Sequence, residues 1–87
     1  MNKLLTLTIF DSKVGEHLQL LTAKSVGEAS RMFESACQDP NSNFNKYPAD
    51  FTLVHNGYYY PESGSLESLE KNIIISSASE YTQNNDN

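Results

Sequence analysis

A single amphipathic helical segment lies between two pairs of strand-like segments, and this limits the folds open to the chain more than any other feature. Ser25 and Glu28 have the spacing of a capping box, in which both side chains accept backbone N–H groups at the start of a helix. Apolar residues then recur at helical spacing, at Ala29, Met32, Phe33, Ala36 and Cys37. Asp39 and Pro40 end the segment, because proline disfavours helical geometry in the residue before it. The pattern predicts one helix of about three turns.

Two short strands are predicted before this helix. Leu5, Leu7 and Ile9 alternate with threonines, and a period of two is typical of a strand with one buried face. Turn residues follow at 11–16, and a second alternating segment spans 17–22. We expect the two strands to pair as a hairpin.

A long connection follows the helix at residues 38–49. Its two prolines and several asparagines favour irregular structure, and Phe44 and Tyr47 are the side chains expected to attach it to the core. The strongest strand signal comes next, at residues 50–60, with Gly57 expected at a β-bulge.

The end of the chain supplies the return strand. A turn is predicted at residues 62–64 and a strand at 65–71, and the apolar run at 73–75 either closes the sheet or covers an edge. Strands paired on both sides of one helix predict an α+β fold: an antiparallel four-stranded sheet with one helix on one face, in the order β-β-α-β-β. Residues 1–79 are expected to form this single domain, and residues 80–87 a flexible polar C-terminal tail.

The small size and thin core of the chain predict self-association. A chain of 87 residues buries only about 60% of the surface that it exposes when unfolded, so its stability is marginal without further contacts. Cys37 is the only cysteine, which excludes a disulfide within the chain. No apolar run approaches the roughly 18 residues of a membrane span, so we expect a cytosolic protein. Because its core is thin, we expect this protein to be a homo-oligomer.

The charge of the chain disfavours strong binding to duplex DNA. Eleven acidic and six basic residues give a net charge of −5, and the basic residues are spread along the chain. Proteins that bind nucleic acid usually have a basic face, because neutralising phosphates releases counterions. A weak contact with single-stranded DNA, led by aromatic side chains, stays open.

Enzyme chemistry has little support in the sequence. His17, His55 and Cys37 lack the converging ligand set that a zinc site needs, and the four glycines do not form a phosphate-binding loop. A nucleophilic pair of Cys37 and His55 would need a third, orienting group. We therefore expect no catalytic residue, no metal and no cofactor.

The run of three tyrosines at residues 58–60 is the feature most open to a functional interpretation. Alternation along a strand would place Tyr59 inward and leave Tyr58 and Tyr60 on the outer face. Two interpretations follow. These tyrosines form a protein-binding or oligomer surface together with Phe44 and Tyr47, or they stack single-stranded bases with help from Arg31 and Lys46.

The connection between helix and strand carries a resemblance to a known family. Asp39-Pro40-Asn41-Ser42, Phe44, Lys46, Pro48, Asp50-Phe51, Leu53 and Gly57 look like the signature stretch of the small nonstructural protein of gokushoviruses, which are single-stranded DNA phages of the Microviridae. The segments at 9–13 and 31–33 are similar too, so the resemblance covers roughly residues 5–81. It departs at Tyr47 and Ala49, where relatives often have histidine and glutamate.

This resemblance implies a non-enzymatic protein, absent from the virion, in the cytoplasm of the infected bacterium. By analogy with other microviruses, it would be a regulatory binding module at the switch from duplex replication to single-stranded genome synthesis and packaging. Its partners would be phage or host replication proteins. Single-stranded DNA is the alternative partner.

Overall fold

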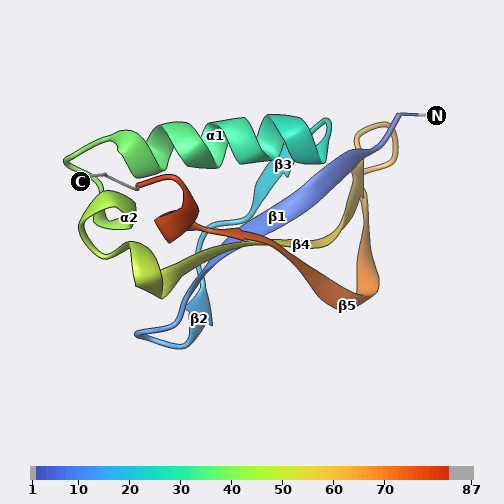
Figure 1. The fold of residues 1–87 in the computed structure, drawn as a ribbon. Coiled ribbons are helices and arrows are strands. Elements are labelled where there is room, and N and C mark those ends of the chain that lie inside the picture. The colour runs from blue at the N-terminus through green and yellow to red at the C-terminus, as the bar shows by residue number, and fades with distance from the viewer. Residues whose placement is uncertain (1, 83–87) are drawn as a thin grey trace.

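The computed structural model describes residues 2–82 as an antiparallel sheet with one long helix packed on one of its faces (Figure 1). The elements follow in the order β1 (Leu4–Asp11), β2 (Glu16–His17), β3 (Leu21–Ala23), α1 (Val26–Gln38), α2 (Asn43–Lys46), η1 (Pro48–Asp50), β4 (Phe51–Tyr60), β5 (Ser65–Ser77) and η2 (Ala78–Glu80). The sheet order is β2-β1-β4-β5, and β3 pairs with the same side of β1 as β2. The predicted α+β fold is confirmed, with five strands in place of four. None of the helices in residues 2–82 has the length and apolarity that crossing a membrane requires.

The extra strand arises because the predicted second strand is interrupted. Phe10 pairs with His17, and Leu7 pairs with Leu21. Between these two pairs β1 advances by three residues, whereas the edge segment advances by four. The surplus residue makes the connection between β2 and β3 bulge, and Leu18 and Leu20 within it are exposed. Alternation alone could not show this interruption, because it follows from pairing with β1.

Helix α1 begins and ends where the sequence predicts. The Ser25 hydroxyl accepts the backbone N–H of Glu28 at 3.1 Å, and Asp39 follows the last helical residue. The Glu28 carboxylate accepts the N–H of Lys24 at 2.6 Å, one residue before the cap, so the capping box is formed only in part. Ala29, Phe33 and Cys37 form the buried stripe.

The connection between α1 and β4 contains the short helices α2 and η1, so the prediction of irregular structure there was wrong. The Ser42 hydroxyl caps α2 by accepting the N–H of Asn45 at 3.2 Å, and Pro48 occupies the first turn of η1. Phe44 packs against the core as expected. Tyr47 does not, since 60% of its surface is exposed.

Strands β4 and β5 form the predicted hairpin. Gly64, with φ at +75°, closes the turn by donating its N–H to the Tyr60 carbonyl at 2.8 Å. The register shifts at Gly57, as the predicted bulge requires. The two segments expected at 65–71 and 73–75 join into one strand of 13 residues.

The C-terminal end of the described chain returns to the core. Glu80 accepts the N–H of Ser77, which caps η2, and the ring of Tyr81 lies 6.0 Å from that of Phe33. Glu80 and Tyr81 therefore belong to the folded part, although the predicted tail began at residue 80. The prediction for residues 83–87 lies outside the described residues.

Candidate protein-binding groove

The residues that the sequence suggested for binding lie at two ends of the molecule. Phe44, Lys46 and Tyr47 are in or beside α2, near the C-terminal end of α1 (Figure 1). Tyr58 is seven residues along β4 from Phe51, the strand residue that contacts Phe44. Seven residues of strand span about 23 Å, so the structure does not bring the two groups together.

Phe44 serves the core. Its ring lies 4.9 Å from that of Phe51 and 5.7 Å from that of Phe33, both in edge-on geometry. Such pairs add to the stability gained by burial. A partner could reach only the part of this side chain that the packing against Phe33 and Phe51 leaves uncovered.

The tyrosines face the opposite way from the prediction. The Gly57 bulge adds one residue to β4, so Tyr58 pairs with Leu5 and Tyr59 with Leu4. Leu5 packs against the core, which places Tyr58, and Tyr60 by alternation, on the helix side of the sheet. The expectation that Tyr59 points inward is wrong, because the bulge reverses the alternation.

Tyr58 and Tyr60 already have partners within the chain. The Lys3 Nζ lies 4.0 Å from the centroid of the Tyr58 ring, and the His55 ring packs edge-on against it at 5.2 Å. The Tyr60 hydroxyl donates to Glu67 Oε1 at 2.8 Å, and this hydrogen bond raises the pKa of Tyr60.

The two basic residues suggested for nucleic-acid binding are also apart. Arg31 lies on the outer side of α1 between Glu28 and Glu34, and Lys46 is exposed on α2. The two carboxylates offset the positive potential around Arg31. No basic surface is formed by these two residues together.

Cys37 and His55 are both buried in the folded chain. Cys37 is fully buried, and burial together with nearby Glu34 raises the pKa of its thiol to about 11. His55 is buried as well, with Nε2 3.0 Å from the Gly57 carbonyl. Among residues 2–82 there is no group of three or more His, Cys, Asp or Glu side chains placed to bind a metal.

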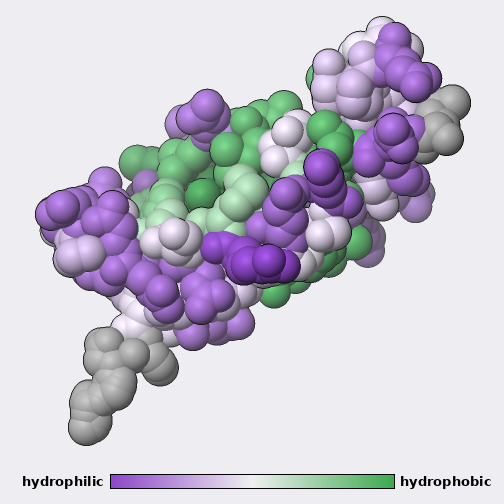
Figure 2. All heavy atoms as spheres, turned by 90° about the horizontal axis from the view of Figure 1, so that it is seen from above, coloured by the Kyte–Doolittle hydropathy of each residue, from purple (hydrophilic) through white to green (hydrophobic). Residues whose placement is uncertain are grey.

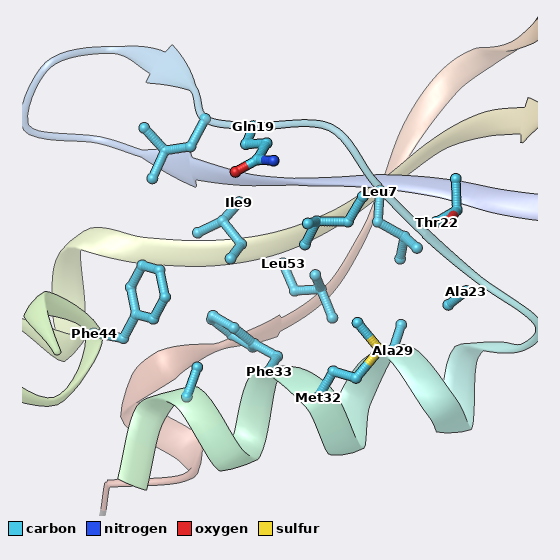
Figure 3. A pocket seen from close by; sticks show the side chains of 13 residues that line it. Leu7, Ile9, Gln19, Thr22, Ala23, Ala29, Met32, Phe33, Phe44 and Leu53 are labelled. Carbon is cyan, nitrogen blue, oxygen red and sulfur yellow. The ribbon is translucent and has the colours of Figure 1, made fainter. Parts of the chain in front are cut away.

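An open apolar groove of about 310 Å³ lies between α1 and the edge of the sheet formed by the β2–β3 segment (Figure 3). Leu7, Ile9 and Leu53 of the sheet face Met32 and Phe33 of the helix across it. The remaining lining residues are Leu18, Gln19, Leu21, Thr22, Ala23, Ala29, Ala36 and Phe44. Only two of the thirteen lining side chains, those of Gln19 and Thr22, are polar.

The groove is open because several of the positions along its walls have small side chains, where larger ones would fill the space. Ala23, Ala29 and Ala36 line the space between helix and strand, and none reaches across it. The β2–β3 bulge also carries Leu18 and Leu20 outward, where they are exposed. The sequence analysis missed this groove, although the three alanines and the leucine cluster at 18–21 were its visible signals.

The apolar surface continues outside the groove. Four large apolar side chains of α1 and the β2–β3 segment are exposed: Leu18 and Met32, which line the groove, and Leu20 and Val26, which do not. Seen from the α1 side, apolar side chains gather in the middle of the molecule beside a band of polar side chains, and polar side chains also lie towards both ends (Figure 2). Apolar patches with a polar rim are typical of interaction sites.

A protein-family model matches most of the chain. Residues 4–81 match the family model described as "Phage ORF5 protein". No curated protein and no solved structure gives a significant match.

Proposed function

Because the chain belongs to the Phage ORF5 protein family, we propose that it is a non-enzymatic phage protein that acts in viral DNA replication by binding another protein. The observation that carries this proposal is the apolar groove between α1 and the β2–β3 segment. The resemblance to gokushovirus nonstructural proteins supports a regulatory role at the switch to single-stranded genome synthesis and packaging. The site of action would then be the cytoplasm of the infected bacterium.

A protein segment fits this groove better than a small molecule does. A groove of about 310 Å³ takes one or two large apolar side chains, which is what anchor residues of a protein interface need. A small molecule held among the lining residues would leave the exposed Leu20 of the β2–β3 segment and Val26 at the start of α1 uncovered. A peptide that continues beyond the groove would cover them.

The charges beside the groove indicate the chemistry of the partner. Met32 lines both the groove and the adjacent outer surface of α1, where Glu28 and Glu34 flank Arg31. The whole chain has a net charge of −5. A basic, amphipathic segment of a phage or host replication protein would match both the acidic surroundings and the apolar groove.

A complementation experiment tests this proposal. Cells carrying a plasmid copy of the gene are infected with a phage of this family whose own copy has an early stop codon. The ratio of single-stranded to duplex viral DNA is then measured. We expect the wild-type chain to restore this ratio, and the groove-filling variant Ala36→Leu to leave it at the level of an empty plasmid.

The control is Val14→Ala, because Val14 is exposed in the β1–β2 turn, away from the groove. It should complement like wild type. Full complementation by Ala36→Leu, from a protein that melts no lower than wild type, would contradict docking in the groove. Failure of the wild-type chain to change the ratio would contradict the replication role itself.

Single-stranded DNA binding is the second candidate, favoured by one observation. Lys3 and Tyr58 place a positive charge and an aromatic ring together at the hairpin end of the sheet, and Tyr60 is nearby on the same face. Stacking of a base on an exposed aromatic ring contributes about 1–3 kcal/mol. Fluorescence anisotropy of a labelled oligonucleotide distinguishes the two candidates. Micromolar binding that weakens with salt, and that is lost in Tyr58→Ala/Tyr60→Ala, would favour the second.

A further inference from the structure

Strand β5 forms one edge of the sheet, and its outer side has no partner strand among residues 2–82. It is the longest strand, at 13 residues. An edge strand presents a row of N–H and C=O groups that can pair with another chain. This edge is separate from the groove, so an inference about it does not rest on the proposed function.

Only part of β5 has the features that usually prevent such pairing. Between His55 and Gly57, β4 advances two residues while β5 advances five, from Ser68 to Ile73. The surplus makes β5 bulge at residues 69–72, where Glu70 and Lys71 add charge. Bulges and charged residues both disfavour pairing between edges.

The segment from Ile73 to Ser77 has less of this protection: it has one surplus residue, at Ile75, where Leu53 and Val54 of β4 pair with Ser76 and Ile74. It contains no charged residue and no proline. Ile74, whose surface is 72% exposed, lies on the sheet face opposite α1, where it borders a shallow depression with Val54 and Phe10. A partner strand at this edge would cover both the backbone groups and Ile74.

We propose that β5 pairs with β5 of a second copy of this chain, antiparallel about a two-fold axis near Ile74, so that the two sheets join into one. The segment is self-complementary in this arrangement. Ile74 faces Ile74 of the second copy, and Ile73 faces Ile75 of the second copy. Polar residues flank this apolar centre on both sides, at Asn72 and Ser76, and these two face each other across the axis.

The charges of Lys71 and Glu80 are complementary in the same antiparallel pairing of two β5 strands. Lys71 is three residues before Ile74, and Ser77 is three residues after it, so each Lys71 lies beside Ser77 of the second copy. The Glu80 carboxylate is within 3.0 Å of the Ser77 backbone nitrogen. The bulge near Ile75 shifts this position by about one residue, within reach of a lysine side chain. Each copy therefore offers an ammonium where the other offers a carboxylate.

The opposite edge of the sheet explains why two copies would suffice. It consists of β2 and β3, which have two and three residues and are separated by the bulge at Leu18–Leu20. So short and interrupted an edge is a poor template for a further strand. Pairing through β5 uses the same surface on both copies and closes as a dimer.

Sedimentation equilibrium of the full chain tests this proposal. We expect wild type to dimerise and Ile74→Lys to weaken the dimer by about tenfold or more, because two like charges would meet at the axis. Two controls exchange equally exposed apolar residues elsewhere: Leu66→Lys, on β5 near the hairpin turn (66% exposed), and Val14→Lys, in the β1–β2 turn (64% exposed). Both controls should dimerise like wild type.

The charge pairing has its own measurement. Lys71→Glu should weaken the dimer, and Lys71→Glu/Glu80→Lys should recover part of the lost affinity. A wild-type chain that stays monomeric up to about 1 mM would overturn the proposal. An Ile74→Lys chain that dimerises like wild type would overturn it too, and so would open-ended polymers in place of dimers.

Discussion

The direction of three tyrosines depends on Gly57. A Cβ atom at this position would lie 2.2 Å from the Glu67 carbonyl oxygen and 3.1 Å from the Thr6 hydroxyl. Glu67 is on the neighbouring strand, so its backbone cannot move away without breaking the ladder. The bulge therefore requires glycine on steric grounds, and the bulge places Tyr58 and Tyr60 on the helix side.

We expect Gly57→Ala to lower the free energy of unfolding by about 2–4 kcal/mol, because β4 and β5 must separate to accept the methyl group. Urea denaturation measures the loss. Gly27→Ala is the matched control, since the nearest atom to an added Cβ there is the Ser25 hydroxyl oxygen at 3.8 Å. In a helix this exchange should stabilise by about 0.4–1 kcal/mol. Equal effects of the two exchanges would contradict the steric explanation.

The buried Cys37 thiol should be unreactive in the folded chain. Its pKa is raised from the usual 9.0 to about 11, so folding favours the neutral thiol. This contribution to stability is fully present below pH 9 and is lost as the pH rises from 9 to 11. Iodoacetamide should modify the unfolded chain much faster than the native one at pH 8.

Cys37→Ala tests the same shift through its pH dependence. Wild type should lose stability relative to this variant between pH 9 and 11, and the difference between the two should be constant below pH 8. Parallel stability curves throughout this range would show that the pKa of Cys37 is the same in both states.

Among the helices and strands, α1 is the one whose first turn depends most clearly on a single capping side chain, that of Ser25. The Ser25 hydroxyl satisfies the N–H of Glu28, one of the N–H groups that a helix start leaves without an internal partner. Helix α1 covers the core through Ala29, Phe33 and Cys37. Loss of the cap therefore destabilises the whole fold.

Ser25→Ala should reduce the free energy of unfolding by about 1 kcal/mol. Ser25→Asp should reduce it by much less, because the aspartate side chain also accepts the backbone N–H of Glu28. Thermal unfolding followed by circular dichroism measures both variants. An aspartate variant as unstable as the alanine variant would mean that the cap hydrogen bond contributes little.

The helices and strands also differ in how well the local sequence predicts them. The ends of α1 and the β4–β5 hairpin follow from local signals: a cap, a proline, a turn glycine and a bulge glycine. The short helices α2 and η1 lie where composition favoured irregular structure. They form where Phe44 packs between Phe33 of α1 and Phe51 of β4, a contact between separate elements that composition does not predict.

At the scale of the whole molecule, the core is incomplete. The buried apolar residues centre on Leu7, Phe33, Cys37 and Leu53, and the groove beside them stays open where three alanines meet. Dispersion contacts are missing along these walls. The thin core expected from the composition therefore has a definite location.

Filling the groove should stabilise the chain. Ala36→Leu adds apolar atoms into open space, and we expect the free energy of unfolding to rise by about 1 kcal/mol. Ala78→Leu is the control: Ala78 is fully buried and lines no groove, so the larger side chain should cost about 1–3 kcal/mol. Calorimetry compares the two variants, and destabilisation of similar size in both would mean that the groove has no room for a leucine.

Local patterns along the chain are enough to predict the α+β class, the order of the main strands and helix, the limits of α1 and the hairpin with its bulge. These depend on periodicity, caps and turn residues, which act between close neighbours in the chain. The packing of separate elements sets which face the tyrosines occupy, that Tyr47 stays exposed while Phe44 joins the core, and that a groove opens beside α1. The tyrosine direction follows from the surplus residue at the Gly57 bulge, and the other two follow from packing between helix and sheet. No local pattern in the chain records such contacts between separate elements.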